Sequence, residues 1–205
     1  PMAATGIVEV GRREHDRAGE VLGRAFHDDP QWARLFPDTG SRLERLTGLF
    51  TGLSKTVVGA RGTGRRPEGF QGVALWLPPG RDLTGWSFVR SGFAMARHLR
   101  MPTAERKKMT RVLGAIGGQR ARVLPEPHWY LLALGVDPAE HGGGWGSSLV
   151  RWGLDRADRD GVSVYLEAET GINSPFYEAL GFTEAHRDTV EEIDLPFSFM
   201  IRRPN

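Results

Sequence analysis

The feature that most constrains this chain is a glycine-rich stretch between an apolar segment and an amphipathic one. The apolar segment, HWYLLALGV at residues 128–136, is typical of a strand buried on both faces. Four glycines follow within residues 142–146, and helical spacing then continues to about residue 159. Glycine at a helix start is unfavourable, so its repeated use indicates a close approach to the backbone. Strand, glycine loop and helix in this order predict an anion site at the first N–H groups of the helix.

The glycine stretch excludes two common nucleotide sites. It matches neither GxxxxGK[ST] nor a GxGxxG followed by an acidic residue about 20 positions later, so neither a nucleoside triphosphatase nor a dinucleotide-binding domain is indicated. Taken by itself, the loop leaves an alternative open, which is a flexible connector without a ligand.

Composition narrows the class of protein. The 205 residues fit one domain, residues 1–205, and 40% hydrophobic with 25% charged residues is typical of a soluble globular protein. No apolar run is long enough to span a membrane, and no secretory signal is visible. The absence of cysteine excludes disulfides, thiolate metal sites and a cysteine nucleophile. We expect a cytoplasmic monomer or homodimer that needs no metal.

Charge is unevenly distributed along the chain. The net charge is only +2, but residues 97–122 hold eight basic side chains and one acidic side chain. Such a segment can meet phosphates, as on a nucleic acid, or can be a solvated helix face. It lies in a stretch of about residues 84–124 that reads as two or three helices inserted before the apolar strand.

The remaining segments predict a mixed α/β chain. Apolar residues at helical spacing predict helices at 14–26, 41–58 and 174–180, and residues 59–70 read as a turn or a loose hairpin. Strands are expected at 6–10, 71–77, 128–136, 162–168, 182–190 and 195–203.

Two motifs at the right separation give the chain a family resemblance. Residues 134–182, LGVDPAEHGGGWGSSLVRWGLDRADRDGVSVYLEAETGINSPFYEALGF, resemble the core of the GNAT superfamily, the Gcn5-related N-acetyltransferases. The phosphate-loop pattern Q/R-x-x-G-x-G/A of that family falls on residues 141–146, and Asn173 and Tyr177 match its second half. The layout of the whole chain is similar to puromycin N-acetyltransferase-like members.

The resemblance implies a fold and a donor. The fold is a central mixed, mostly antiparallel sheet that splays between its fourth and fifth strands, flanked by helices. The donor is acetyl-coenzyme A, with its pantetheine arm in the splay and its thioester near Gly135, where glycine suits a strand bulge. The residues implied in donor binding are Leu134, Gly135, Val136, His141, Gly142, Gly143, Gly144, Trp145, Gly146, Ser147 and Asn173.

Three side chains are candidates for proton transfer. Tyr177 matches the residue that protonates the departing thiolate in the family, although a helix tyrosine can simply pack on a strand. Glu167 and Glu169 alternate with apolar residues, so both carboxylates face one side of their strand, and Glu167 is the first candidate base. His128, at the start of the apolar strand, is the second.

Other residues are expected to shape the acceptor site. They are His27, Asp28 and Asp29 in the loop after the first helix, Glu169, and Trp76, for which a place in the hydrophobic core is the alternative. His141 stands where the family usually has glutamine or arginine, and Gly143 where a basic residue is frequent, so both positions lack the usual donors to the pyrophosphate.

Three functions fit these observations. The first is an N-acyltransferase that moves an acyl group from the coenzyme to the amine of a small molecule, as in antibiotic resistance or biosynthesis. The second is a transferase of the same fold with a phosphate-bearing partner such as an aminoacyl-tRNA, suggested by the basic segment. The third is a non-catalytic acyl-coenzyme A sensor, suggested by the altered loop.

Overall fold

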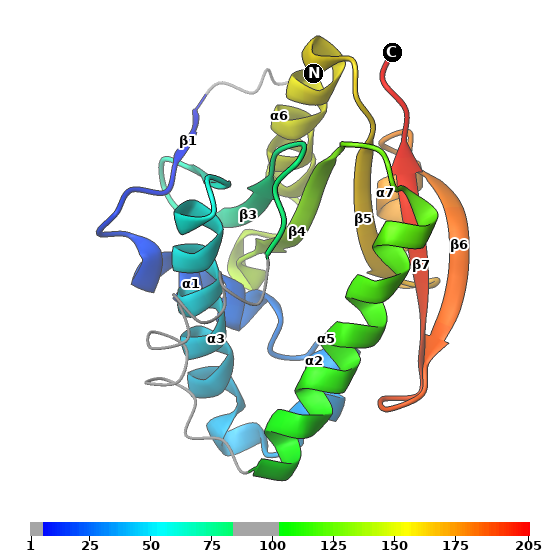
Figure 1. Cartoon of the computed structure of the whole chain (residues 1–205). Coiled ribbons are helices and arrows are strands. Elements are labelled where there is room, and N and C mark those ends of the chain that lie inside the picture. Colours follow the sequence, from blue (N-terminus) through cyan, green and yellow to red (C-terminus); the bar gives the residue numbers. More distant parts are fainter. Residues whose placement is uncertain (1–5, 84–102) are drawn as a thin grey trace.

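The computed structural model describes residues 6–83 and 103–205, which form a seven-stranded sheet flanked by helices (Figure 1). The strand order is β1-β2-β3-β4-β5-β7-β6, and every neighbouring pair except β4–β5 is antiparallel. This confirms the mixed α/β fold with a mostly antiparallel sheet. The strands are β1 Ile7–Glu9, β2 Thr63–Pro67, β3 Gly72–Leu77, β4 Trp129–Val136, β5 Val164–Glu169, β6 Thr183–Val190 and β7 Leu195–Arg202.

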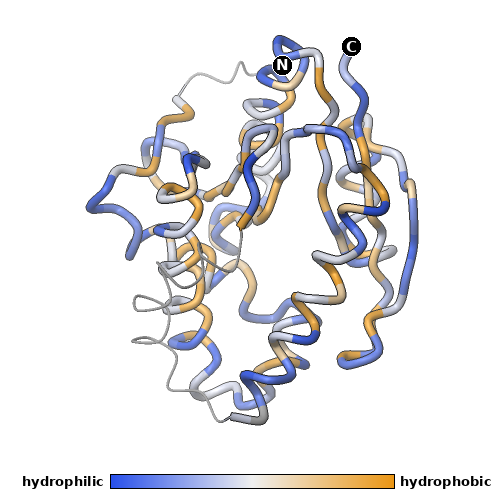
Figure 2. The backbone as a smooth tube through the Cα atoms, viewed as in Figure 1, coloured by the Kyte–Doolittle hydropathy of each residue, from blue (hydrophilic) through white to orange (hydrophobic). Residues whose placement is uncertain are grey.

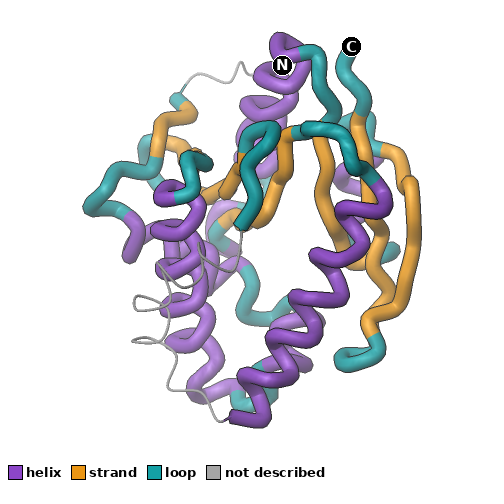
Figure 3. The backbone as a smooth tube through the Cα atoms, in the orientation of Figure 1, coloured by secondary structure: helices purple, strands orange, loops and turns teal. Residues whose placement is uncertain are grey.

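Helices cover both faces of the sheet (Figures 1 and 3). They are α1 His15–Ala25, α2 Pro30–Leu35, α3 Thr39–Gly59, α5 Thr103–Val123, α6 Trp145–Asp160 and α7 Ser174–Glu178, with a short 3-10 helix at Pro138–Glu140. The part of the expected helical insert at residues 84–102 lies outside the described residues. No helix in the described part of the chain combines the length and the apolarity that a membrane span needs.

The sheet splays between β4 and β5, as the resemblance implies. The two strands pair only at Trp129 with Val164 and at Tyr130 with Tyr165, after which no pairing joins them. Because β4 continues to Val136 and β5 to Glu169, a gap opens between the carboxyl ends of two parallel strands. Both strands stay fixed on their other sides, β4 by β3 and β5 by β7.

The β4 bulge lies earlier than the sequence suggests. Leu75 of β3 pairs with Ala133 and Trp76 pairs with Leu131, which leaves Leu132 as the extra residue. The expectation of a bulge at Gly135 is therefore wrong. Gly135 is required by helix packing instead, because a Cβ there would lie 2.8 Å from the Ala25 Cβ and 2.9 Å from a Leu22 methyl carbon.

Two cores lie on opposite faces of the sheet. One contains Leu149, Val150 and Leu154 of α6 and the buried Trp76 of β3, while the other packs α1, α3 and α5 against the opposite face. Gly153 of α6 lies directly over Trp76, since a Cβ at Gly153 would be 2.4 Å from two carbons of the indole ring.

Two glycines allow α1 and α3 to pack closely. A Cβ at Gly19 would lie 2.1 Å from the Thr51 Oγ1, and a Cβ at Gly23 would lie 2.6 Å from the Thr47 Oγ1. The close packing of α3 holds α1 in place, and the loop that leads into α2 follows directly after α1.

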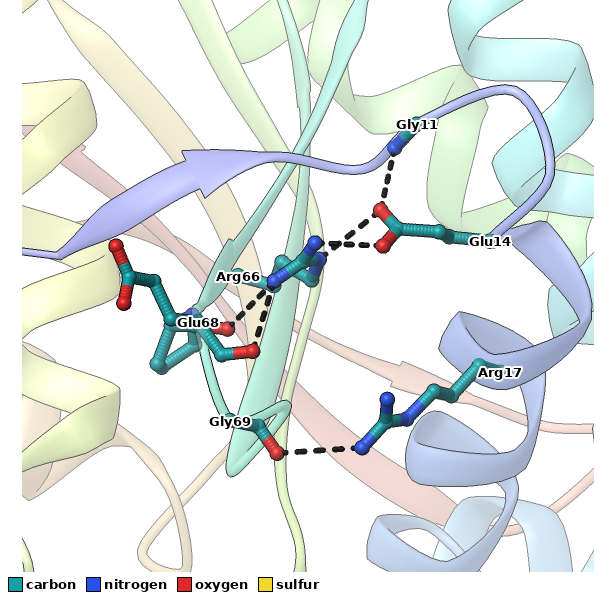
Figure 4. Close-up of polar contacts among 7 residues, drawn as sticks. Gly11, Glu14, Arg17, Arg66, Glu68 and Gly69 are labelled. Atoms are coloured by element: carbon teal, nitrogen blue, oxygen red, sulfur yellow. Dashed lines mark hydrogen bonds and ion pairs between the residues drawn. The ribbon is translucent and has the colours of Figure 1, made fainter.

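A polar cluster ties the start of α1 to the turn between β2 and β3 (Figure 4). The Arg66 guanidinium donates two hydrogen bonds to the Glu14 carboxylate, at 2.6 and 3.1 Å, and further hydrogen bonds to the Pro67 and Glu68 carbonyls. Glu14 also accepts from the Gly11 N–H at 2.8 Å. This cluster fixes the end of α1 that lies away from the glycine loop.

The β2 strand replaces the expected turn or loose hairpin. Its sequence, TGRRP, has no apolar alternation, but Arg65 places its guanidinium 4.2 Å from the centre of the Trp152 ring. At the other edge of the sheet, β6 is exposed along nearly its whole length and predominantly hydrophilic (Figure 2).

Candidate active site

One large cavity lies between the helices and the splayed strands. It has a volume of about 1310 Å³ and extends from the glycine loop, past the carboxyl ends of β4 and β5, to α2, α3 and α5. Much of its wall is apolar and aromatic, with Phe26, Trp32 and Phe50 in mutual contact. Polar groups on its wall lie at the glycine loop, on β5, at the start of α2 and on α5, where Arg106 and Arg120 line the cavity.

The glycine loop contributes backbone donors to one end of the cavity. Gly142 and Gly144 have φ angles of +83° and +75°, which L side chains rarely adopt, so glycine is required at both positions. Gly144 is also the N-cap of α6, and no side chain caps this helix. The first N–H groups of α6 are therefore available beside the cavity, where the helix dipole adds positive potential.

Most residues implied in donor binding line this part of the cavity. They are Leu134, Gly135, Val136, His141, Gly142, Gly144, Trp145, Gly146, Ser147 and Asn173. Gly143 does not line it, and a Cβ there would meet the Trp145 ring at 2.9 Å. The His141 Nε2 lies 3.3 Å from the Val136 carbonyl, and the His141 side chain is exposed.

Glu167 lies in the cavity wall near the start of the gap. Its Oε2 accepts a hydrogen bond of 2.8 Å from the Tyr130 hydroxyl, and its Oε1 is buried without a donor among the described residues. Burial raises the pKa of Glu167 to about 7, although the Tyr130 hydrogen bond opposes that rise. A carboxylate with this pKa can accept a proton near neutral pH.

Glu169 forms a second acidic position with Asp29. The Gln31 N–H is shared, at 2.8 Å from the Glu169 Oε1 and 3.1 Å from the Asp29 Oδ1. Asp29 is the N-cap of α2, which explains its place in the loop, and both side chains line the cavity. Burial raises the pKa of both carboxyl groups, and their proximity raises that of Glu169 further.

Tyr177 and Asn173 approach the cavity from α7. The Tyr177 ring packs between Phe176 and Phe182, with ring centres 5.0 and 5.8 Å away, and burial raises the pKa of its hydroxyl above the usual value. The phenol therefore holds its proton at neutral pH, as a general acid requires. Asn173 is the N-cap of α7 but makes no side-chain capping bond, and it lines the cavity.

Besides Gly143, four expected site residues lie away from the cavity. Trp76 is fully buried beneath α6, so its expected role in substrate binding is wrong. His27 and Asp28 pair with each other at 2.7 Å, and neither side chain lines the cavity. His128 contacts the Glu126 carbonyl and the Tyr165 ring instead of the cavity, which leaves Glu167 as the better placed base.

The structure adds polar residues that the sequence reading missed. Tyr130 reaches Glu167 across the start of the splay, and the Arg120 guanidinium stacks 4.6 Å from the centre of the Tyr130 ring. Arg42 is buried in α3 and donates to the carbonyls of residues 27, 36 and 37, which fixes the loop that carries Asp29. The alternation of β4 could have indicated Tyr130, whereas nothing local marks Arg42.

The basic segment is partly engaged within the chain. Lys108 donates to the Arg34 carbonyl at 3.0 Å, Arg111 lies 3.8 Å from the Glu192 carboxylate, and Arg120 pairs with Asp82. Among the described residues, no group of three histidine, aspartate or glutamate side chains is arranged to hold a metal ion.

Comparison with known proteins agrees with this arrangement. The model of the acetyltransferase (GNAT) family matches residues 74–182, which include most of β3 together with β4, the glycine loop, α6, β5 and α7. The chain belongs to the GNAT acetyltransferase family. It is thus an N-acetyltransferase by family, and the puromycin N-acetyltransferase-like subtype stays a prediction.

Relatives support the family and the fold. The uncharacterized N-acetyltransferase C550.08 of Schizosaccharomyces pombe is 28% identical over 95% of this chain and 82% of its own length. Among solved structures, the histone acetyltransferase HPA2 and related acetyltransferase of Corynebacterium glutamicum has a TM-score of 0.66 and 23% identity, covering 98% of this chain and 96% of its own. Arylalkylamine N-acetyltransferase 2 of Aedes aegypti has a TM-score of 0.60 and 14% identity, covering 97% and 98%.

Proposed function

We propose that this GNAT acetyltransferase transfers an acetyl group from acetyl-coenzyme A to the amine of a small molecule in a ternary complex. The observation that carries the proposal is the continuity of the cavity, which joins the glycine loop, the splay of β4 and β5 and the buried carboxyl groups. Its volume of about 1310 Å³ exceeds that of a typical single-ligand pocket, roughly 300–1,000 Å³, so donor and acceptor fit together.

The glycine loop suits the pyrophosphate of the donor. The uncapped N–H groups at the start of α6 and the open space around Gly142 and Gly144 favour an anionic group close to the backbone. His141 offers one further donor, which is weaker than the glutamine or arginine usual in the family. Backbone contacts would therefore dominate the binding of the phosphates.

The gap between β4 and β5 suits the pantetheine arm. The edges of β4 and β5 that face each other beyond Tyr130 and Tyr165 have no strand partner, so their backbone groups can pair with the amides of the arm. The bulge at Leu132, rather than Gly135, would place the acyl group level with Glu167 on the neighbouring strand.

The side chains divide the proton transfers between two sides of the reacting centre. The donor supplies an acyl group on a thioester, which an amine can attack directly without an enzyme nucleophile. Glu167 would accept the proton of the attacking amine, and Tyr177 would give a proton to the departing thiolate sulfur. Tyr130 would position Glu167 through their hydrogen bond of 2.8 Å. Holding both substrates in one cavity would supply much of the acceleration.

A calorimetric titration with acetyl-coenzyme A tests the donor half of the proposal. Gly144→Ala adds a methyl group beside the first N–H groups of α6, in a backbone conformation that is strained for alanine. Gly161→Ala is the matched control. Gly161 has a φ of +66° at the other end of the same helix, and a Cβ at either position has nothing within 4 Å. We expect Gly144→Ala to weaken binding at least about tenfold, by loss of one charge-assisted contact, and Gly161→Ala to leave it within about twofold.

The outcomes distinguish a direct effect on phosphate binding from an indirect effect of backbone strain in α6. If both substitutions weakened the binding of acetyl-coenzyme A equally, the cause would be destabilisation of α6 and not loss of contacts at its first N–H groups. No binding by the unchanged protein would reject acetyl-coenzyme A as the donor. Binding followed by release of coenzyme A on addition of small amines would support the complete reaction.

A further inference from the structure

The pair formed by Asp29 and Glu169 is not used in the proton transfers proposed above. Its two carboxyl groups come from different elements, one from the loop before α2 and the other from the end of β5. Both accept from the single Gln31 N–H, which brings them into direct proximity. Asp29 alone is sufficient to cap α2, because it also accepts from the Trp32 N–H, so helix capping does not require the second carboxylate that Glu169 adds.

This acidic pair has no cation partner among the described residues. Glu169 is only 3% exposed, and its Oε2 is buried without a hydrogen-bond donor. Arg34 of α2 lowers the pKa of Glu169 through its charge, but its guanidinium donates to the Ile193 and Asp194 carbonyls and lies 3.7 Å from the Asp194 carboxylate. Arg106 and Arg120 of α5 also line the cavity, and Arg120 pairs with Asp82. Two buried carboxylates that share one N–H donor are strongly disfavoured when both are charged, which points to a positive ligand from the cavity.

The pair lies at a defined distance from the proposed base. Glu167 and Glu169 are two residues apart on β5, so their Cα atoms are separated by about 7 Å on the same face of the strand. The surrounding wall is aromatic, and the centres of the Trp32 and Phe50 rings are 5.4 Å apart. An apolar spacer between two positive nitrogens matches both the separation and this wall.

We infer that the Asp29–Glu169 pair is a second cation site, and that the acceptor is a diamine whose attacking nitrogen lies beside Glu167 while its other nitrogen binds the pair. The inference rests on the proposed acetyl transfer and names its substrate class. Arg42 acts as a positioning residue, because it fixes the carbonyls of the loop that carries Asp29.

The test compares diamines with monoamines of the same length. Putrescine and cadaverine are assayed against n-butylamine and n-pentylamine with acetyl-coenzyme A, in the unchanged protein and in Glu169→Gln and Asp29→Asn. Both substitutions keep an oxygen acceptor, and asparagine remains a good N-cap, so the fold is retained. Glu20→Gln is the control, because Glu20 is an exposed carboxylate on α1 that does not line the cavity.

We expect the diamine to be preferred in kcat/KM by about 10- to 100-fold, the range for a hydrogen bond to a charged group. Glu169→Gln and Asp29→Asn should reduce this ratio to within about threefold of unity, while Glu20→Gln should leave the ratio of the unchanged protein. A ratio near unity in the unchanged protein would overturn the inference. So would an equal loss for both kinds of amine in Glu169→Gln, which would place the attacking nitrogen on the pair.

Direct titration of putrescine into the protein, without a donor, separates this inference from the proposed function. Binding of putrescine that weakens in Glu169→Gln but not in Glu20→Gln supports the cation site even if no acetyl transfer occurs. Acetyl transfer to monoamines together with absent putrescine binding would overturn the cation site and leave the proposed function standing.

Discussion

At the scale of single residues, Glu167 carries the sharpest prediction. Its pKa of about 7 means that the carboxylate forms, and the base becomes available, as pH rises through neutrality. We expect kcat/KM for an amine to rise with pH through about 7, and Glu167→Gln to lower it by about 10²- to 10⁴-fold. An unchanged pH profile in Glu167→Gln would remove Glu167 from the role of base, and Glu20→Gln serves as the charge-matched control.

The same pKa shift predicts a change in stability. The pKa of Glu167 is raised from 4.5 to about 7, so the folded state holds a proton that the unfolded state has already released between these values. Stability from this group is therefore present below pH 4.5 and is lost as pH rises through about 7. Glutamine has no such loss, so Glu167→Gln should be more stable than the unchanged protein at pH 8 by roughly 1–3 kcal/mol and equally stable near pH 4. Chemical denaturation at the two pH values measures this, and an equal difference at both would contradict it.

Residue-scale prediction from sequence succeeded where the chemistry was local. Strand alternation places Glu167 and Glu169 on one face, and both line the cavity. Alternation could not find that Glu169 meets Asp29, because Gln31, whose N–H both carboxylates share, lies 138 positions before Glu169 and only tertiary packing brings them together. Likewise, the aromatic character of Trp76 suggested a pocket, whereas its burial under Gly153 places it in the core.

At the scale of elements, the packing of α6 on β3 depends on the absence of a side chain at Gly153. A Cβ there would lie 2.4 Å from the Trp76 ring, which is fully buried and has no space to move into. We expect Gly153→Ala to destabilise the protein by about 1–3 kcal/mol through overpacking. Gly118→Ala is the matched control within α5, where a Cβ has nothing within 4 Å, and should stabilise by about 0.5–1 kcal/mol. Thermal unfolding compares them, and equal melting temperatures would refute the close contact.

At the scale of elements, the sequence predicts the helices and strands that have a strong hydrophobic periodicity. It does not predict those that form because of contacts between residues far apart in the chain. β4, α6 and β5 follow from apolar runs and turn residues in the sequence. β2 does not, because Arg65 is accommodated by stacking on Trp152 and Arg66 by its hydrogen bonds to Glu14, rather than by apolar alternation. Glycine often marks a bulge, so the sequence predicts one at Gly135, but glycine is needed there because α1 packs closely against that position.

At the scale of the whole molecule, two halves of the sheet meet through only two residue pairs, so a donor in the gap would join them. We expect acetyl-coenzyme A to slow amide hydrogen exchange in residues 131–136 and 166–169, as well as in the glycine loop at 141–147, because the arm covers backbone groups that lack strand partners. The control ligand is 3′-phosphoadenosine 5′-diphosphate, the nucleotide part of the donor, which should protect the loop and leave both strand segments unchanged. If the nucleotide alone also slowed exchange in the strand segments, the protection would come from a general stabilisation of the fold and not from contact with the pantetheine arm. Protection confined to the loop by both ligands would place the arm outside the splay, and the proposed position of the acyl group beside Leu132 and Glu167 would then fail.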